Sequence, residues 1–288
     1  MEPRKLSQEE FPSALLEIPN PPKNLWIIGN LPSKKENCVY LCVVGSRKSS
    51  IYGRDVCKKL INALASFPVI IVSGFALGID TIAHQSAIEA GLRTIVFPGS
   101  GLSEKALYPK INNNLIKKVL DAGGCFLSEF SPDFQATPWS FPMRNRLMAG
   151  ISKATLVIEA GEKSGTLITA KMALEYNKDL LAVPGSIFAP NSLGANYLIH
   201  QGAVPITTEK DLIEALGFEA KDTQIQKEKE LQNLSSKEIQ ILEILNTPLS
   251  KENLIHLAEI PIIEANILLS VMEIKGLIKE EMGEIRKA

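Results

Sequence analysis

Short runs of apolar residues recur along the middle of the chain, separated by segments with helical spacing. The runs are continuous rather than alternating, which is typical of strands covered on both faces of a parallel sheet. They lie at 39–44, 69–72, 93–97, 125–128, 155–159, 180–183 and 203–205. Helices are expected at 52–66, 80–90, 112–122, 167–177 and 193–201. This alternation predicts an α/β fold with a doubly wound, mostly parallel sheet over about residues 37–217.

The two flanks of this region follow other patterns. Residues 1–36 contain six prolines, so we expect an irregular lead-in without a long helix. Residues 218–233 are polar and charged and predict a linker. Beyond it, helical spacing recurs at 235–245, 251–258 and 262–273, and a short hairpin is expected at 277–285. Three helices and a wing of this size resemble a small winged-helix domain at 234–288.

The acidic charge of the C-terminal segment bears on its role. The third expected helix carries Glu264 and Glu273, and a helix that meets a phosphate backbone should not be acidic. We therefore favour a protein-interaction or dimerisation role for the segment over base readout in a DNA groove.

Composition narrows the class of protein. Hydrophobic residues make up 45% of the chain, enough for a sizeable core, and the net charge is −1. Binding of a polyanion would therefore depend on a local basic patch. The four cysteines form no CxxC pair, so we expect reduced core residues and no metal site. The start of the chain shows no apolar signal region and no run reaches about 18 apolar residues, which favours a soluble cytoplasmic protein without a membrane partner.

Most of the expected strands end in glycine and small polar residues. The carboxyl ends of parallel strands meet at one edge of a sheet, so these turns should lie together. Glycine lets backbone N–H groups approach a ligand, and helix N-termini add a positive field. The turns are Gly45-Ser46-Arg47, Ser73-Gly74, Gly99-Ser100-Gly101, Ser164-Gly165-Thr166 and Pro184-Gly185-Ser186. Together they predict a site for a phosphate-bearing ligand.

The segment 141–175 adds charge to that edge. Arg144, Asn145 and Arg146 begin one expected helix, and the Ser164 turn begins the next. Two guanidinium groups beside free helix N–H groups favour an anion. Phe141, three residues before Arg144, is a candidate ring for stacking a base, although its spacing fits a core phenylalanine equally well.

Motifs for enzymatic chemistry are absent from the sequence. The first turn lacks GxGxxG, which disfavours NAD, and SGTLITAK lacks the lysine of a P-loop. No serine stands in a nucleophile elbow. His84 is interpreted as structural and Asp80 as a helix cap. We predict no catalytic set, no cofactor and no metal.

Several of these segments together resemble the DNA-processing protein A (DprA/Smf) family. The resemblance spans about residues 39–204 and is carried by VVGSRKSSIYG, VSGFALGIDTIAH, FPGSGLSEKALYP, FPMRNRLMAGIS and VIEAGEKSGTLITAKMALE. It implies an extended Rossmann-like domain that binds single-stranded DNA without being an enzyme. It also implies a homodimer that protects incoming DNA and delivers it to the recombinase RecA during natural transformation.

Carried onto this chain, the DNA-contacting pattern of the family implies a set of site residues. They are Gly45, Ser46, Arg47, Ser73, Gly74, Gly99, Gly101, Phe141, Arg144, Asn145, Arg146, Ser164, Gly165, Thr166 and Lys171. Leu77 departs from the family, because many members carry a positive charge at this position. We expect that departure to weaken the basic patch modestly.

Two other functions remain as alternatives. The first is a nucleoside-monophosphate phosphoribohydrolase of the lysine-decarboxylase-like (LOG) group, which has a related fold. That group uses a glutamate shortly after a GGxGT turn, whereas Gly165-Thr166 is followed here by Leu167, Ile168 and Thr169. A carboxylate to stabilise a developing sugar cation is therefore missing. The second alternative is a nucleotide sensor that holds a mononucleotide in the same site.

Overall fold

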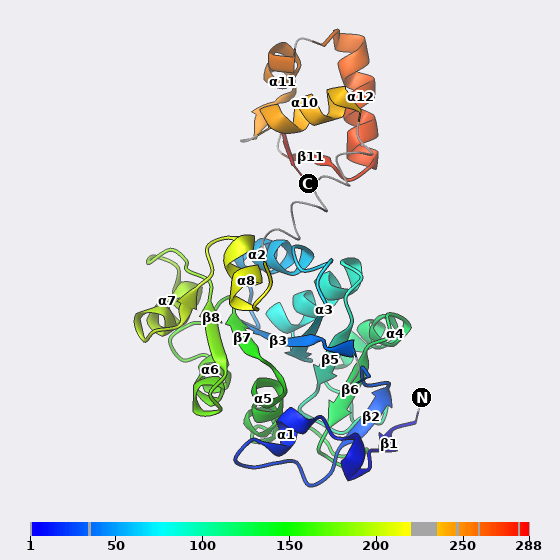
Figure 1. Cartoon of the computed structure of the whole chain (residues 1–288), viewed down its shortest axis with the longest axis vertical. Coiled ribbons are helices and arrows are strands. Elements are labelled where there is room, and N and C mark those ends of the chain that lie inside the picture. The colour runs from blue at the N-terminus through cyan, green and yellow to red at the C-terminus, as the bar shows by residue number, and fades with distance from the viewer. Residues whose placement is uncertain are drawn as a thin grey trace. The chain divides into compact units, whose positions relative to one another are not determined.

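The computed structural model of the protein divides into two compact units, Met1–Glu219 and Ala220–Ala288 (Figure 1). It describes residues 2–33, 36–219, 235–245, 248–258, 260–281 and 283–287. From residue 220 on, the expected linker lies outside the described residues.

The first unit is built on one sheet, in which the described strands follow the order β1-β2-β6-β5-β4-β3-β7-β8-β9. The strands are β1 (Arg4–Lys5), β2 (Trp26–Gly29), β3 (Val39–Val44), β4 (Val69–Gly74), β5 (Thr94–Phe97), β6 (Cys125–Ser128), β7 (Ala154–Val157), β8 (Asp179–Ala182) and β9 (Val204–Pro205). Every neighbouring pair from β6 to β9 is parallel. The chain winds from β3 to β6 on one side and from β7 to β9 on the other, so the order reverses between β3 and β7. The doubly wound, mostly parallel Rossmann-like sheet expected from the sequence is confirmed.

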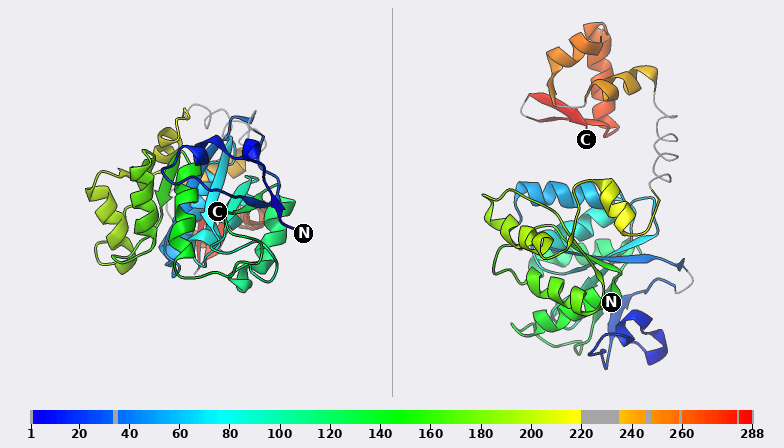
Figure 2. Two further views of the ribbon diagram at one scale, coloured as in Figure 1. Left: turned by 90° about the horizontal axis from the view of Figure 1, so that it is seen from below. Right: turned by 60° about the vertical axis from the view of Figure 1, so that its left-hand side comes forward.

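Helices cover both faces of this sheet (Figure 2). They are α1 (Ser13–Leu16), α2 (Ile51–Asn62), α3 (Ile79–Glu89), α4 (Asn113–Asp121), α5 (Ser140–Ile151), α6 (Thr166–Glu175), α7 (Leu193–His200) and α8 (Glu209–Ala215). Successive side chains of a strand point to opposite faces. Accordingly, Cys42 and Val44 pack with α5, α6 and α7, whereas Leu41 and Val43 pack with α2, α3 and α8. Each face therefore has its own apolar core.

The N-terminal lead-in is more ordered than the sequence predicted. It contributes β1, β2 and α1, and β2 pairs antiparallel with β6, which makes the sheet mixed. Leu25, Ile27 and Ile28 are buried against the sheet. An apolar run this short, close after a proline pair, is too brief to show a period, so only its pairing with β6 reveals it as a strand.

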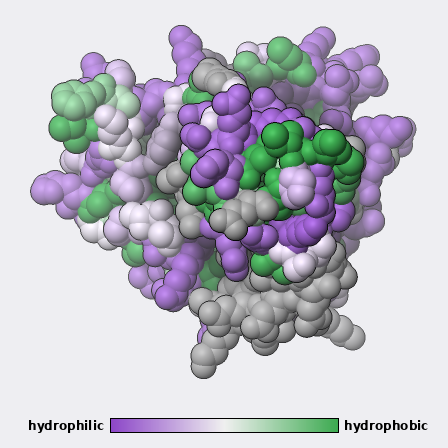
Figure 3. All heavy atoms as spheres, turned by 90° about the horizontal axis from the view of Figure 1, so that it is seen from above, coloured by the Kyte–Doolittle hydropathy of each residue, from purple (hydrophilic) through white to green (hydrophobic). Residues whose placement is uncertain are grey.

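The second unit contains the three helices and the hairpin expected from the sequence. Its elements are α10 (Ser236–Ile244), β10 (Leu249–Ser250), α11 (Lys251–Ala258), α12 (Ile262–Ile274), β11 (Ile278–Glu281) and β12 (Glu284–Lys287). The short β10, which the sequence did not indicate, joins the hairpin in a sheet of order β10-β12-β11. Ile241, Leu254 and Met272 lie in a core of its own. Three isoleucines of α12, Ile262, Ile263 and Ile267, are exposed. Figure 3 views the molecule from above and shows hydrophobic side chains beside hydrophilic ones on that face.

Three of the four cysteines are buried, as expected of core residues. All four cysteines are free, and burial raises the pKa of Cys42, Cys57 and Cys125 to about 12. These three are therefore protonated core residues. No single helix in the described part of the chain is long and apolar enough to cross a membrane; α11 and α12 meet that test only jointly, across a bend of 114°.

Candidate nucleic-acid interface

A cavity of about 800 Å³ opens at the carboxyl edge of the sheet, where the strand order reverses between β3 and β7. In open α/β sheets this crevice is the usual ligand site. Its walls are the turn after β3, the turn after β4, the first half of α5 and the turn 161–166 that leads into α6. Four of the glycine-rich or basic segments expected from the sequence thus meet around one space, called the large cavity below.

The charged residues that line the large cavity are mostly positive. Arg47, Lys48 and Lys163 are exposed at its rim, and Arg144 lies buried in its wall. Asp80 is the one carboxylate among the described residues that line it. The first turn of α6, whose N-cap is Gly165, adds backbone N–H groups at the same place. The surplus of cations suits a ligand that carries more than one negative charge.

Arg144 is held rigidly between the ends of β4 and β5. Its side chain is 5% exposed, and its guanidinium donates to the carbonyl of Phe97 and to Oδ1 of Asn145 at 3.2 Å. A Cβ atom on Gly74 would lie 2.4 Å from Nη1 of Arg144 and 2.2 Å from Oδ2 of Asp80. Gly74 is therefore required because both charged groups pack on its backbone.

Burial and opposite charge act against each other in this pair. Burial raises the pKa of Asp80, and the Arg144 guanidinium and the Ala76 N–H hold that pKa down. Burial likewise lowers the pKa of Arg144, and Asp80 opposes the shift. Each group thus stabilises the charged form of the other.

Asp80 does not cap its helix, contrary to the sequence-based interpretation. Gly78 is the N-cap of α3, with φ of 79°, and Asp80 Oδ2 instead accepts from the Ala76 N–H at 3.3 Å. A side chain on Gly78 would meet the carbonyl oxygen of Ser46 at 2.3 Å. The turn after β4 therefore approaches the turn after β3 more closely than a side chain would allow.

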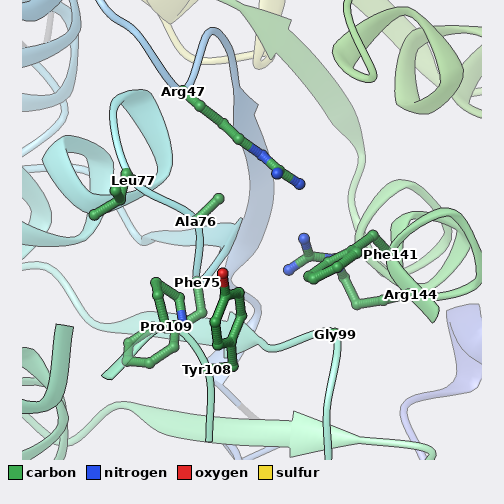
Figure 4. Close-up of a pocket in the computed structure, with 9 residues that line it drawn as sticks. All are labelled: Arg47, Phe75, Ala76, Leu77, Gly99, Tyr108, Pro109, Phe141 and Arg144. Carbon is green, nitrogen blue, oxygen red and sulfur yellow. The ribbon is translucent and has the colours of Figure 1, made fainter. Parts of the chain in front are cut away.

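Phe141 forms the boundary between the large cavity and a second pocket of about 100 Å³, called the Phe141 pocket below (Figure 4). The guanidinium carbon of Arg47 lies 5.2 Å from the centre of the Phe141 ring, a cation–π distance. The ring of Tyr108 lies 6.5 Å away on the other side of the pocket. The Phe141 ring rests on Gly99, where an added Cβ would come within 2.4 Å of it. The ring of Phe141 is therefore partly exposed, and Phe141 is not the core phenylalanine that its spacing also allowed.

Five of the predicted site residues line neither cavity. One is Gly74, which packs beneath Asp80 and Arg144 as described above. Ser73 is fully buried and donates to the carbonyl of Val43 at 2.6 Å. Gly101 packs closely on the carbonyls of Ser131 and Pro132. Lys171 points outward from α6 and pairs with Glu175 at 3.7 Å.

Arg146 is the fifth of these residues. It forms an ion pair with Glu129 and donates to the carbonyl of Asn20 at 2.6 Å, so it holds the lead-in onto the domain. Two residues along a helix correspond to a rotation of about 200°, so Arg144 and Arg146 face opposite ways. The pair of guanidinium groups expected to bind one anion is therefore separated.

The structure adds residues that the sequence analysis passed over. Lys48 and Lys163 belong to turns already singled out, and their charge was the available signal. Tyr108 comes from the connection after β5 and lines the Phe141 pocket. No sequence pattern singled it out, because only the folded chain brings it there. Leu77, the position noted above as a departure from the family, also lines that pocket and is 44% exposed.

His84 is structural, as the sequence analysis favoured. It is fully buried, and its ring nitrogens lie 2.7 Å from Oγ1 of Thr94 and 2.6 Å from the carbonyl of Gly74. Burial lowers its pKa to about 4, so the ring is neutral at pH 7. Among the described residues, no group of three or more histidine, cysteine or acidic side chains is arranged to hold a metal ion.

The comparisons with known proteins agree on one family. The sequence model of DNA recombination-mediator protein A matches residues 4–217, which includes the lead-in and the whole sheet. This chain belongs to that family. Protein Smf of Escherichia coli is 38% identical over 210 residues, which cover 73% of this chain and 55% of the relative. The chain spans about half the length of the Smf proteins from Escherichia coli and Synechocystis.

Solved structures of the family share this fold. DNA processing protein A (DprA) from Streptococcus pneumoniae superposes with a TM-score of 0.68 at 37% identity, covering 75% of this chain and 74% of the other. DNA processing protein A from Helicobacter pylori, which was studied for its single-stranded DNA binding mode, gives 0.66 at 30% identity and covers 75% of this chain and 95% of the other. The family resemblance stated from the motifs is thereby confirmed.

Proposed function

We propose that this chain is a non-enzymatic protein that binds single-stranded DNA along the carboxyl edge of its sheet. The observation that carries the proposal is the joining of the large cavity, with its basic rim, to a partly exposed phenylalanine ring. The related protein from Helicobacter pylori binds single-stranded DNA, which supports the same ligand here.

The arrangement favours a single strand over a duplex. Arg47, Lys48 and Lys163 are suited to phosphates, because lysine and arginine at an exposed rim bind them without reading sequence. Phe141 offers its ring to a base inside a pocket of about 100 Å³. Only an unpaired base can leave its neighbours and stack there. The site therefore combines phosphate contacts with a pocket that only an unpaired base can enter.

Nothing among the described lining residues supplies a catalytic pair. Asp80 is engaged with the Ala76 N–H and faces Arg144. Glu159, which follows β7, accepts from the backbone N–H of Ser50 at 3.0 Å and lines a different pocket. This supports binding without hydrolysis and disfavours the phosphoribohydrolase alternative.

The test is a titration of a labelled single-stranded oligonucleotide and of its duplex at several salt concentrations, followed by anisotropy. We expect preference for the single strand and a log affinity that falls linearly with log salt. Arg47→Ala and Lys163→Ala should each reduce that slope by about 1. Lys171→Ala is the matched control, because Lys171 lies on α6 but lines neither cavity.

Any of three outcomes would refute the proposal. Equal affinity for the duplex would exclude a role for unpaired bases. Release of free base from a nucleoside monophosphate would show a hydrolase, and tight binding of a mononucleotide without oligonucleotide binding would show a sensor.

We further propose that the chain acts as a homodimer and passes its strand to RecA during natural transformation, as its family membership suggests. Exposed apolar side chains around α7, such as Phe188 at 90% and Tyr197 at 57%, offer a surface that a second copy would cover. Sedimentation of wild type and Phe188→Ser tests the dimer. Assembly of RecA on a strand coated with single-strand-binding protein, with and without this chain, tests the transfer; no gain in assembly rate would contradict it.

A further inference from the structure

A cluster of three aromatic rings lies next to the segment that carries Phe141. The rings of Phe130 and Phe134 are stacked, with centroids 4.4 Å apart and planes inclined by 16°. Trp139 meets both in edge-to-face contacts, with centroid distances of 5.7 Å and 5.5 Å. The two phenylalanines are half-buried, whereas 55% of Trp139 is exposed. The indole is thus held in place by two rings yet open to solvent.

The backbone around Trp139 is fixed to the same edge of the sheet. The next residue, Ser140, is fully buried and its hydroxyl donates to the carbonyl of Gly99. The Gly101 N–H donates to the carbonyl of Phe134 at 2.8 Å. The loop after β6 therefore packs on the turn after β5, on which the Phe141 ring also rests.

The order of the strands shows how these features follow one another along the edge of the sheet. Strands β7, β3, β4, β5 and β6 lie side by side, which spans about 19 Å at the usual strand spacing. Basic side chains gather over β7 and β3, the Phe141 pocket lies over β4 and β5, and the aromatic cluster follows β6. Pro138, the residue before Trp139, still lines the large cavity. The edge is thus continuous from the phosphate-binding end to the indole.

We propose that Trp139 is a second base-stacking platform for single-stranded DNA, placed beyond Phe141 on the same strand path. This rests on the function proposed above and names a further residue of that site. Base stacking on an aromatic ring tolerates any sequence, because every base has a π face. Trp139 is suited to it because an indole that is already held by its neighbours loses little conformational entropy on binding. Lys105 and Lys110, exposed on the connection after β5, supply positive charge on this side of the sheet.

Tryptophan fluorescence tests the contact directly, because the chain contains two tryptophans. Trp26→Phe removes the other indole, which lies half-buried in β2. In this variant an oligo(dT) strand should quench the Trp139 emission to saturation, in step with binding measured by anisotropy. An oligonucleotide of equal length without bases should leave the emission unchanged. Binding of oligo(dT) without quenching would overturn this inference alone, whereas no binding of any single strand would overturn the proposed function.

Substitution gives a second, independent readout. Trp139→Leu should weaken oligo(dT) binding roughly 5- to 100-fold, the range for one stacked base, and Trp139→Phe should restore most of it. The salt slope should stay unchanged, because no phosphate contact is removed. Leu16→Ala is the control, since Leu16 is 50% exposed and belongs to α1, far along the chain from the site.

The same variants distinguish base stacking from a purely structural role of Trp139. A changed salt slope in Trp139→Leu would indicate that the basic rim had moved, and so a structural role only. Wild-type affinity in Trp139→Leu would contradict the inference. A shift in sedimentation of the unliganded variant would show that Trp139 is covered by a second copy and would contradict it as well. Unchanged thermal unfolding confirms in each case that the fold is intact.

Discussion

Removing the buried guanidinium of Arg144 should expose how the site is held together. Arg144→Met keeps the bulk of the side chain and takes from Asp80, which is 7% exposed, the positive charge that does most to hold its pKa down. Breaking a buried charge pair in this way typically costs about 3–5 kcal/mol. For a unit of about 200 residues this corresponds to a fall in Tm of roughly 6–20 °C.

The loss of stability should depend on pH with a definite sign. Burial already raises the pKa of Asp80, and Arg144 holds it down, so the substitution raises it further. A carboxyl whose pKa is raised in the folded state loses stability as pH rises from its unfolded pKa through its folded pKa. The deficit of Arg144→Met relative to wild type should therefore be largest at neutral pH. It should shrink as pH falls toward 3.8, the ordinary value for aspartate.

The assay is urea unfolding followed by tryptophan emission, which reports the first unit because Trp26 and Trp139 both lie in it. Adding Asp80→Asn to Arg144→Met should restore most of the stability at pH 7, since no unpaired charge remains. The double variant should nevertheless bind single-stranded DNA more weakly than wild type, because the Arg144 guanidinium is missing. A deficit that does not vary with pH, or that Asp80→Asn does not repair, would refute the reasoning.

Two further predictions rest on single contacts, and a third rests on the division of the chain into two units. Gly99→Ala should displace the Phe141 ring, because the new Cβ would lie 2.4 Å from it. It should weaken oligo(dT) binding by about 1–3 kcal/mol with little change in Tm. Unchanged affinity would show that Phe141 does not contribute to binding. Arg146→Leu should lower the Tm by leaving Glu129 unpaired but keep the salt slope of wild type, and a reduced slope would place Arg146 in the DNA site after all. Deletion of residues 220–288 should preserve most single-strand binding in an anisotropy titration, and complete loss would assign binding to the second unit.

The sequence predicts the sheet well because its strands are buried on both faces. Continuous apolar runs such as 39–44 and 125–128 coincide with β3 and β6, and the intervening helices follow within a few residues. The lead-in strand β2 was missed because its burial depends on pairing with β6, which leaves no periodic signal in four residues.

The site was predicted in part, for equally physical reasons. The turns around Arg47 and Ser164 do meet at one edge, because parallel strands must end together. Arg144 and Arg146 were grouped by their distance in sequence, although helical rotation turns them to opposite faces. Tyr108 and Trp139 reach this edge through long connections after β5 and β6, and a sequence pattern does not record such a convergence.

Amide hydrogen exchange with and without saturating oligo(dT) tests the central claim most directly, because it locates the strand on the protein. We predict protection in the turns after β3 and β4, at residues 139–145 and in the first turn of α6, with no change in residues 235–287. Protection confined to the second unit, or to segments remote from the carboxyl edge of the sheet, would contradict the account.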